Sequence, residues 1–237
     1  MNLELIPHAT SQDRSGFGVF SHGDAGDAHV MAHRMLDEER YELGHRLLGA
    51  WLEQHEGNGS RWTHLQWHMG VFEIAVGRWK AALRRFETEI LPVAAASFDA
   101  LTDAPAMLWR LQLAAPRPVA LDWEAVHDAA ARCLAEPCDA YVELHCLLAL
   151  AGSGDIEALD RWLWARRSPE DRAAKVLTQM GVGLKAFAAE EYDLAAEVLT
   201  TAAPKVSLLG GSHAQNQLFQ QIADRCWARA QTMTQAA

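Results

Sequence analysis

A helix-turn-helix pattern recurs along this chain and limits its fold more than any other feature. Each copy has a helix with periodic apolar residues, a turn that ends in a large residue, and a second helix that starts with small residues. The clearest copies are Gly77-Arg78-Trp79-Lys80-Ala81-Ala82 and Glu190-Glu191-Tyr192-Asp193-Leu194-Ala195. The large turn residues are Tyr41, Trp79, Trp123, Ile156 and Tyr192, which lie 38, 44, 33 and 36 positions apart. These intervals bracket the roughly 34-residue period of tetratricopeptide repeats.

A single helix pair of this kind cannot bury its apolar face, so neighbouring pairs have to stack. We therefore expect an all-α fold: a right-handed α-solenoid of about five tetratricopeptide-like helix-turn-helix repeats plus a C-terminal helix. Residues 25–237 form one repeat domain in this prediction, and residues 1–24 form a partly irregular N-terminal segment. The stretch Pro116–Pro118 makes the third turn irregular. Alternating strand patterns are too short to predict a sheet.

Capping residues predict where several helices begin and end. Thr63-x-x-Gln66 and Ser212-x-x-Gln215 are capping-box patterns, and Ser168-Pro169 places a cap before a first-turn proline. Pro92 is expected to close the helix that follows Trp79. The N–H groups after Gly210-Gly211 could hold an anion, but capping by Ser212 is the use that we expect.

Composition excludes several classes of protein. Hydrophobic residues make up 50% of the chain and charged residues 22%, which is a globular balance. No apolar run approaches the ~18 residues of a membrane span, and the N-terminus lacks a signal-peptide pattern. We therefore expect a cytoplasmic protein that does not enter a membrane. The net charge of −10 argues against a nucleic-acid partner. No close-spaced cysteine pair occurs, so isolated buried thiols are expected and not a zinc site; the thiols are Cys133, Cys138, Cys146 and Cys226.

Two histidine pairs with a spacing of four residues stand out. His29 and His33 form one pair, and His64 and His68 form the other. Side chains at positions i and i+4 share one face of a helix, and imidazole is a common metal ligand. Such a pair can hold one divalent ion, and a neighbouring helix could complete the coordination from the other pair or from Glu73 or Glu143. A divalent metal ion is therefore a candidate cofactor, with His29, His33, His64 and His68 as its candidate ligands.

Four stretches of the chain resemble one known family. They are AHVMAHRMLDEERYELG at 28–44, HLQWHMGVFEIAVGRWKAAL at 64–83, APAMLWRLQL at 104–113 and LLGGSHAQNQLF at 208–219. In this order they resemble the tetratricopeptide repeat protein 38-like proteins over most of residues 25–222. The resemblance implies an all-helical repeat array and no particular reaction. It marks five positions at which the family carries histidine, which are His29, His33, His68, His145 and His213. The repeats that usually come before residue 25 have no counterpart here, so the resemblance implies that this end is differently capped or used in association.

The leading helix of each pair should line the concave side of the solenoid. With Ala32 and Gly70 at the close contacts between helices, the histidines of the first two repeats turn toward one groove. His145 takes the corresponding place in the fourth repeat, and Trp67 is expected in the groove wall, where it could stack on a flat or cationic ligand. His68 and His145 are the candidate catalytic residues. The predicted ligand-binding residues are His29, His33, His64, Trp67, His68, Glu143, His145 and His213.

Three functions remain open from the sequence. The first is a ligand-binding repeat protein whose groove holds a small molecule or a peptide segment. The second is an enzyme that uses the same histidines as metal ligands or as a general acid and base. The third is a structural subunit whose N-terminal end forms a homodimer. No G-x-S-x-G, Walker or dinucleotide-binding motif favours a particular reaction.

Overall fold

The computed structural model describes residues 23–166 and 171–236, and every regular element in this part of the chain is a helix. The predicted all-α class is therefore confirmed. The elements are α2 (Ala25–Asp37), α3 (Tyr41–Gln54), α4 (Gly59–Ala75), α5 (Trp79–Arg85), the π-helical η1 (Phe86–Ile90), α6 (Leu91–Ala96), α7 (Ala104–Ala114), α8 (Glu124–Leu134), α9 (Ala140–Ser153), α10 (Ile156–Ala165), α11 (Arg172–Ala188), α12 (Tyr192–Ala202), the 3₁₀-helical η2 (Ala203–Leu208) and α13 (His213–Ala236). Most of the predicted segment 1–24 lies outside the described residues, and the single domain 25–237 stays a prediction.

The large turn residues mark the starts of the second helices. Four of them are the first residues of α3, α5, α10 and α12, and Trp123 immediately precedes α8. Trp123 packs between two helix pairs, because its ring fills the space next to Gly152 on α9. A Cβ atom at Gly152 would lie 2.4 Å from that ring. Trp123 thus packs against a glycine of the next pair and fixes how closely these two pairs approach.

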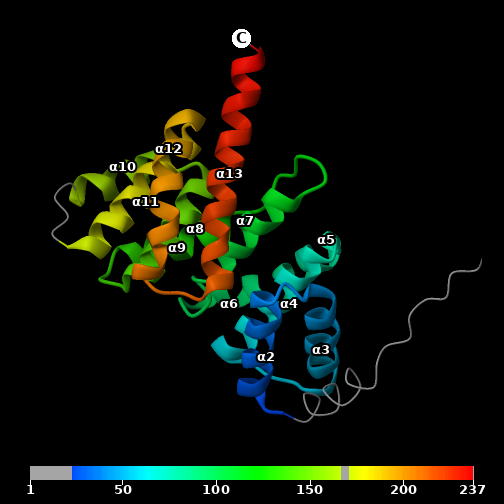
Figure 1. Ribbon diagram of the computed structural model, residues 1–237. Helices are drawn as coiled ribbons and strands as arrows, with labels where there is room; N and C mark the ends of the chain where they lie inside the picture. Colours follow the sequence, from blue (N-terminus) through cyan, green and yellow to red (C-terminus); the bar gives the residue numbers. More distant parts are fainter. Residues whose placement is uncertain (1–22, 167–170, 237) are drawn as a thin grey trace, which may run out of the picture.

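The leading helices form a continuous row. Helix α2 packs on α4, α4 on α7, α7 on α9, and α9 on α11. Each second helix also packs on the leading helix that follows it, as α3 does on α4 and α12 on α13. In Figure 1, α7 and α13 lie between the N-terminal helices and the group formed by α8 to α12. Helix α13 contacts both α7 and α2, so the last helix returns to the first one described.

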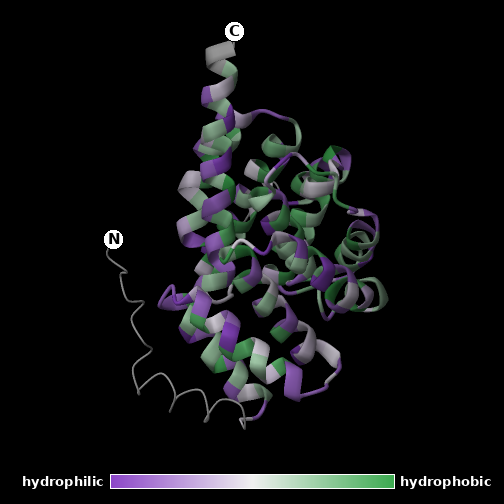
Figure 2. Ribbon diagram, turned by 90° about the vertical axis from the view of Figure 1, so that its right-hand side faces the viewer, coloured by the Kyte–Doolittle hydropathy of each residue, from purple (hydrophilic) through white to green (hydrophobic). Residues whose placement is uncertain are grey.

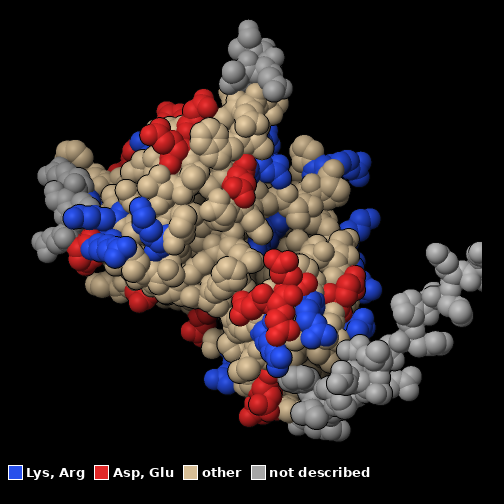
Figure 3. Space-filling view, viewed as in Figure 1, with Lys and Arg blue, Asp and Glu red and all other residues tan. Residues whose placement is uncertain are grey.

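The hydrophobic core lies between the leading helices and the second helices that pack on them, as the hydropathy colours of Figure 2 show. Ala32 of α2 is fully buried, and a Cβ atom at Gly70 of α4 would lie 2.7 Å from Cε of Met107 in α7. Gly70 is therefore a close contact between α4 and α7, as the sequence predicted. Polar and charged side chains are also buried in this core, and they lie on three leading helices or just before one of them. They are Thr63, Gln66, His68 and Glu73 on α4, Asp103 just before α7, Arg110 on α7, and Glu143 and His145 on α9. On the outer face seen in Figure 3, acidic and basic side chains form small interspersed groups.

Two predicted helix ends are wrong. Helix α4 begins at Gly59, so Thr63 lies inside it, where its hydroxyl donates to the carbonyl oxygen of Gly59 at 3.1 Å. Pro92 does not end its helix, because the chain continues from α5 through η1 into α6. Proline lacks an N–H group, and the wider π-helical turn before it, with Leu91 N–H bonded to the Phe86 carbonyl, accommodates that missing donor.

The capping box at the start of α13 is confirmed. The amide of Gln215 donates to Oγ of Ser212 at 3.2 Å, and the amide of Ser212 donates to Oε1 of Gln215 at 2.9 Å. Ser212 therefore uses its hydroxyl to satisfy the helix start, as expected. The predicted cap at Ser168-Pro169 lies outside the described residues. Within those residues, no helix is long and apolar enough to cross a bilayer.

Candidate metal centre

Four histidines converge between α2 and α4. His29, His33, His64 and His68 each offer a ring nitrogen, and these nitrogens all lie within 4.8 Å of one another. The ring centroids of His33 and His68 are 4.5 Å apart, and those of His29 and His64 are 5.1 Å apart. Each pair shares a helix face because of its spacing, and the two faces meet because α2 packs on α4. We call these four residues the four-histidine cluster.

Asp103 orients one ring of the cluster. Its carboxylate is buried and accepts a hydrogen bond from Nδ1 of His64, with distances of 2.9 and 3.0 Å to its two oxygens. With the proton held on Nδ1, Nε2 of His64 keeps its lone pair for a metal ion. Burial lowers the pKa of His64, but the hydrogen bond and the charge of Asp103 outweigh burial, and the pKa is raised overall.

Sequence reasoning missed Asp103. An aspartate directly before a helix predicts an N-cap, and Asp103 does occupy that position of α7. Its side chain makes no capping hydrogen bond there, because it bonds to His64 instead. Only a buried partner from another helix distinguishes this aspartate from an ordinary cap.

His68 is the most unusual member of the cluster. Its side chain is fully buried, and neither Nδ1 nor Nε2 has a hydrogen-bond partner in the described part of the chain. Burial, followed by the neighbouring His64, His33 and His29 rings, holds the pKa of His68 well below its ordinary value. The ring is therefore neutral near pH 7. Buried polar atoms in proteins are nearly always bonded, so two ring nitrogens left unbonded by the described residues point to a partner outside that part of the chain, such as a metal ion.

His29 and His33 complete the cluster from α2. Their Nε2 atoms are 3.0 Å apart, so one ring donates to the other when no ion lies between them. Burial and the nearby His33 and His64 rings lower the pKa of His29 to about 4, and burial also lowers the pKa of His33. Neutral imidazole is the form that binds metals. Two nitrogens that share a tetrahedral ion at the usual zinc–nitrogen length would lie about 3.3 Å apart, close to the observed separation.

Trp67 supports the cluster from inside the core. Its indole lies parallel to the His64 ring, with an interplanar angle of 4° and centroids 5.4 Å apart, and it meets His68 edge to face. The guanidinium of Arg110 lies over the same indole, 5.6 Å from the ring centroid. Trp67 is fully buried. It therefore offers no open face to a ligand in solvent, contrary to its expected place in a groove wall.

The two glutamates considered as further metal ligands are bonded elsewhere. Glu143 is buried and accepts hydrogen bonds from Trp162 Nε1 and from Arg166. Glu73 accepts two hydrogen bonds from Arg85, at 2.8 and 3.0 Å. Neither glutamate belongs to the four-histidine cluster.

The two other predicted histidines lie apart from the cluster. Nδ1 of His145 donates to the carbonyl oxygen of Tyr141 at 2.8 Å, and its ring packs against Tyr141 and Phe219. Its Nε2 is buried and has no partner among the described residues. Burial lowers the pKa of His145 to about 4. His213 is exposed at the start of α13, beside Gln217. The structure thus brings four of the predicted histidines together and places His145 and His213 elsewhere.

The sequence predicted isolated thiols, but Cys133, Cys138 and Cys146 are neighbours. Burial and then the nearby Cys133 thiol raise the pKa of Cys138 to about 12, and the same two causes raise the pKa of Cys146. All four cysteines are unbridged.

Among the described residues, the four-histidine cluster is the group whose geometry fits a metal ion. No protein-family model matches this chain, and no solved structure matches it.

Proposed function

We propose that this protein binds a divalent transition-metal ion on His29, His33, His64 and His68. The observation that carries the proposal is His68, a fully buried imidazole packed against three other imidazoles, for which the described residues offer no hydrogen-bond partner at either ring nitrogen. Clusters of imidazoles suit zinc, copper, nickel and iron. The hydrogen bond from His64 to Asp103 supports the proposal, because metal-bound histidines commonly donate their second ring N–H to a carboxylate.

The bound ion would serve a small-molecule site. His29, His33 and His64 are each partly exposed, so the cluster has one side that solvent reaches. From that side a water molecule or a small ligand could approach the ion. This is the metal-dependent form of the ligand-binding function that the sequence suggested. Its enzymatic form is the second candidate, because an ion open to water lowers the pKa of that water and creates a nucleophile.

We also propose that the helix pairs form a solenoid that carries this metal site. A right-handed solenoid of about five tetratricopeptide-like repeats, as in the tetratricopeptide repeat protein 38-like proteins, would place the leading helices on its inner side. The row of contacts from α2 to α11 supports this arrangement. Because α2 and α4 are consecutive leading helices, the partly exposed His29, His33 and His64 would face that inner side, whereas His68 lies buried beside them.

Metal analysis tests the proposal directly. The chain is produced without an affinity tag, stripped with a chelator and titrated with Zn²⁺ by calorimetry. We expect one ion per chain, and we expect His33→Ala and His68→Leu to weaken binding at least 100-fold. The matched control is His213→Ala, which removes an exposed histidine outside the cluster and should leave binding unchanged. Equal affinity in all four proteins would refute the proposed centre.

Cobalt distinguishes the two forms of the function. Four-coordinate Co²⁺ absorbs visible light much more strongly than six-coordinate Co²⁺. A weak spectrum that changes when azide is added would indicate coordination positions open to a ligand. A strong spectrum that azide does not change would indicate that four imidazoles close the site, and the ion would then have a structural role.

A further inference from the structure

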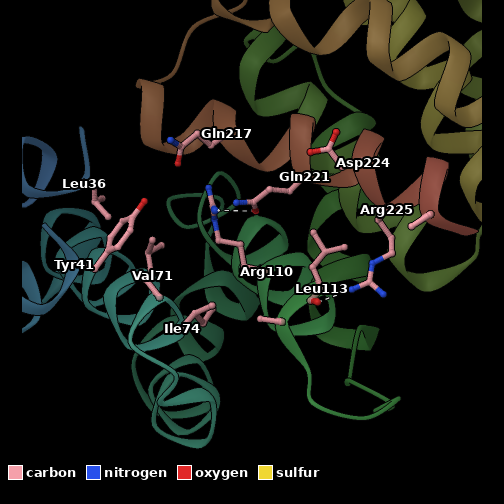
Figure 4. A pocket seen from close by; sticks show the side chains of 13 residues that line it. Leu36, Tyr41, Val71, Ile74, Arg110, Leu113, Gln217, Gln221, Asp224 and Arg225 are labelled. Carbon is pink, nitrogen blue, oxygen red and sulfur yellow. Dashed lines mark hydrogen bonds between the residues drawn. The ribbon is translucent and has the colours of Figure 1, made fainter. Parts of the chain in front are cut away.

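A second site adjoins the four-histidine cluster. A cavity of about 490 Å³ lies between α2, the start of α3, α4, α7 and α13. Leu36 and Val71 in its wall are each three positions after a cluster histidine, His33 and His68 respectively, so the cavity extends from the cluster by one helical turn. Figure 4 shows Tyr41, Ile74, Arg110 and Gln221 around the same space. This volume is typical of a site for a small organic molecule.

Arg110 is the exceptional residue in this cavity. It is only 5% exposed, and no carboxylate within the described part of the chain forms an ion pair with it. Its Nη2 donates to the carbonyl oxygen of Ala214 at 2.6 Å, whereas Nη1 reaches Oε1 of Gln221 only at 3.4 Å. Its buried Nε has no acceptor among the residues that the structure describes. Burial lowers the pKa of Arg110 to about 10, so the group remains a cation near pH 7.

A buried cation without an anionic partner is costly, and proteins rarely retain one without a use. The neutral hydrogen-bonding groups of the cavity are chiefly the Tyr41 hydroxyl and the Gln217 and Gln221 amides. A second cation, the half-buried Arg225, also lines the cavity, and its Nη2 donates to the carbonyl oxygen of Leu113 at 2.6 Å. The acidic lining residue, Asp224, occupies an exposed position of α13. The remaining wall is largely apolar, with Leu36, Val71, Ile74 and Leu113 as its larger side chains.

We propose that this cavity binds a small monocarboxylic acid, with its carboxylate on Arg110 and its apolar body against Leu36, Val71 and Ile74. Arginine is suited to this because its planar guanidinium matches a carboxylate with parallel hydrogen bonds. Arg110 is the buried cation of a mainly apolar wall, whereas Arg225 is only half-buried and already donates to a backbone carbonyl. The cavity therefore fits one negative charge on an apolar molecule better than a polyphosphate. The inference rests on Arg110 and its cavity, and it holds whether or not the four-histidine cluster binds a metal.

Calorimetry on chelator-treated protein tests this site separately from the metal centre. The probes are octanoate and phenylacetate, compared with octylamine and 1-octanol. The wild-type chain should bind at least one of the two acids, and it should bind the amine and the alcohol at least tenfold more weakly. Arg110→Gln should weaken acid binding at least tenfold. Its matched control is Arg161→Gln, which neutralises an exposed arginine on α10 and should change nothing.

Because Arg110 also joins α7 to α13, its replacement could affect folding, and a second variant keeps the test decisive. Ala75→Trp fills the cavity from an exposed position of α4, and Ala131→Trp is its matched control on an exposed position of α8. Ala75→Trp should abolish acid binding, whereas Ala131→Trp should not. The proposal is overturned if neither acid binds the wild-type chain at millimolar concentration, if octylamine or 1-octanol binds as well as the acids, or if a folded Arg110→Gln or Ala75→Trp protein binds the acid as the wild type does.

Discussion

The carboxylate of Asp103 and the imidazole of His64 are hydrogen-bonded across 39 residues of sequence, with Nδ1 2.9 Å from the nearer oxygen. If the four-histidine cluster binds a metal ion, this carboxylate fixes the tautomer that leaves Nε2 free. We therefore expect Asp103→Asn to lower the Zn²⁺ affinity about 10- to 100-fold without abolishing binding. Competition with a chelator of known affinity measures the change.

Asp139 provides the control for this substitution. It caps α9 through a hydrogen bond to the amide of Tyr141 and lies outside the cluster. Asp139→Asn keeps a capping side chain and should leave the Zn²⁺ affinity unchanged. An equal loss of affinity in both variants would show that the effect of Asp103 is general destabilisation.

Replacing His68 with leucine should have opposite effects on the metal-free and metal-loaded proteins. Leucine is similar in volume and removes two buried ring nitrogens that have no partner in the described residues, so the metal-free variant should be more stable than wild type by about 1 kcal/mol. At a Zn²⁺ concentration 100 times Kd, the wild type should gain about 2.7 kcal/mol that the variant does not. Urea unfolding with and without Zn²⁺ measures both effects. A metal-free variant less stable than wild type would show that the His68 ring stabilises the core by itself.

Two glycines of α3 should respond oppositely to alanine. A Cβ atom at Gly44 would lie 2.3 Å from the buried ring of Phe72, so Gly44→Ala should destabilise the fold by about 1–3 kcal/mol. A Cβ atom at Gly49 would have its nearest neighbour at 3.4 Å, which is an ordinary contact. Gly49→Ala should therefore stabilise the helix by up to about 1 kcal/mol. Thermal unfolding of the two variants checks the sign; the same sign for both would contradict the packing described here.

His127 should make stability depend on pH. Nε2 of His127 is 3.0 Å from Asp155, and Nδ1 is 3.1 Å from Asp128. Burial lowers the pKa of His127, but the raising effect of the two aspartates is larger. The pKa of His127 in the folded state is therefore above its ordinary value. A raised pKa means that the stabilisation is fully present below the unfolded-state pKa of about 6.5 and is lost as the pH rises through the folded-state value.

The His127→Gln variant isolates this contribution. Below about pH 6 the wild type should be more stable than the variant by about 0.5–1 kcal/mol, as expected for a partly exposed ion pair. The difference should shrink as the pH rises above about 6.5 and through the raised folded-state pKa of His127, and also when salt is added at low pH. Urea unfolding of both proteins at pH 5.5 and 8.5 measures the two differences. A difference that grows with pH would mean that the aspartates do not stabilise the protonated ring.

The helix pairs could be predicted because their signals are local. Tyr41, Ile156 and Tyr192 each begin a second helix, and the capping box at Ser212 has both of its hydrogen bonds. These patterns depend on neighbours within one or two helical turns, which sequence spacing determines. The wrong prediction at Pro92 was also local in origin, because a π-helical turn is a rarer response to proline than a helix end.

The candidate sites were predictable only in part. The spacing of His29 and His33, and of His64 and His68, places each pair on one face of its helix, and this much follows from the helical repeat. Which other side chains reach those faces depends on packing between distant segments. Asp103 reads as a helix cap and Arg110 as one cation among many in the sequence, and neither was predicted to take part.

The sequence by itself determined the all-helical class, the positions of the helix pairs and the two local histidine patches, because each of these depends on residues a few positions apart. Tertiary structure alone decided that the two patches face each other, that Asp103 bonds to His64 and that Arg110 is buried without a carboxylate partner among the described residues. The physical reason is that burial and pairing of polar groups depend on how whole helices pack, and residues far apart along the chain supply the partners.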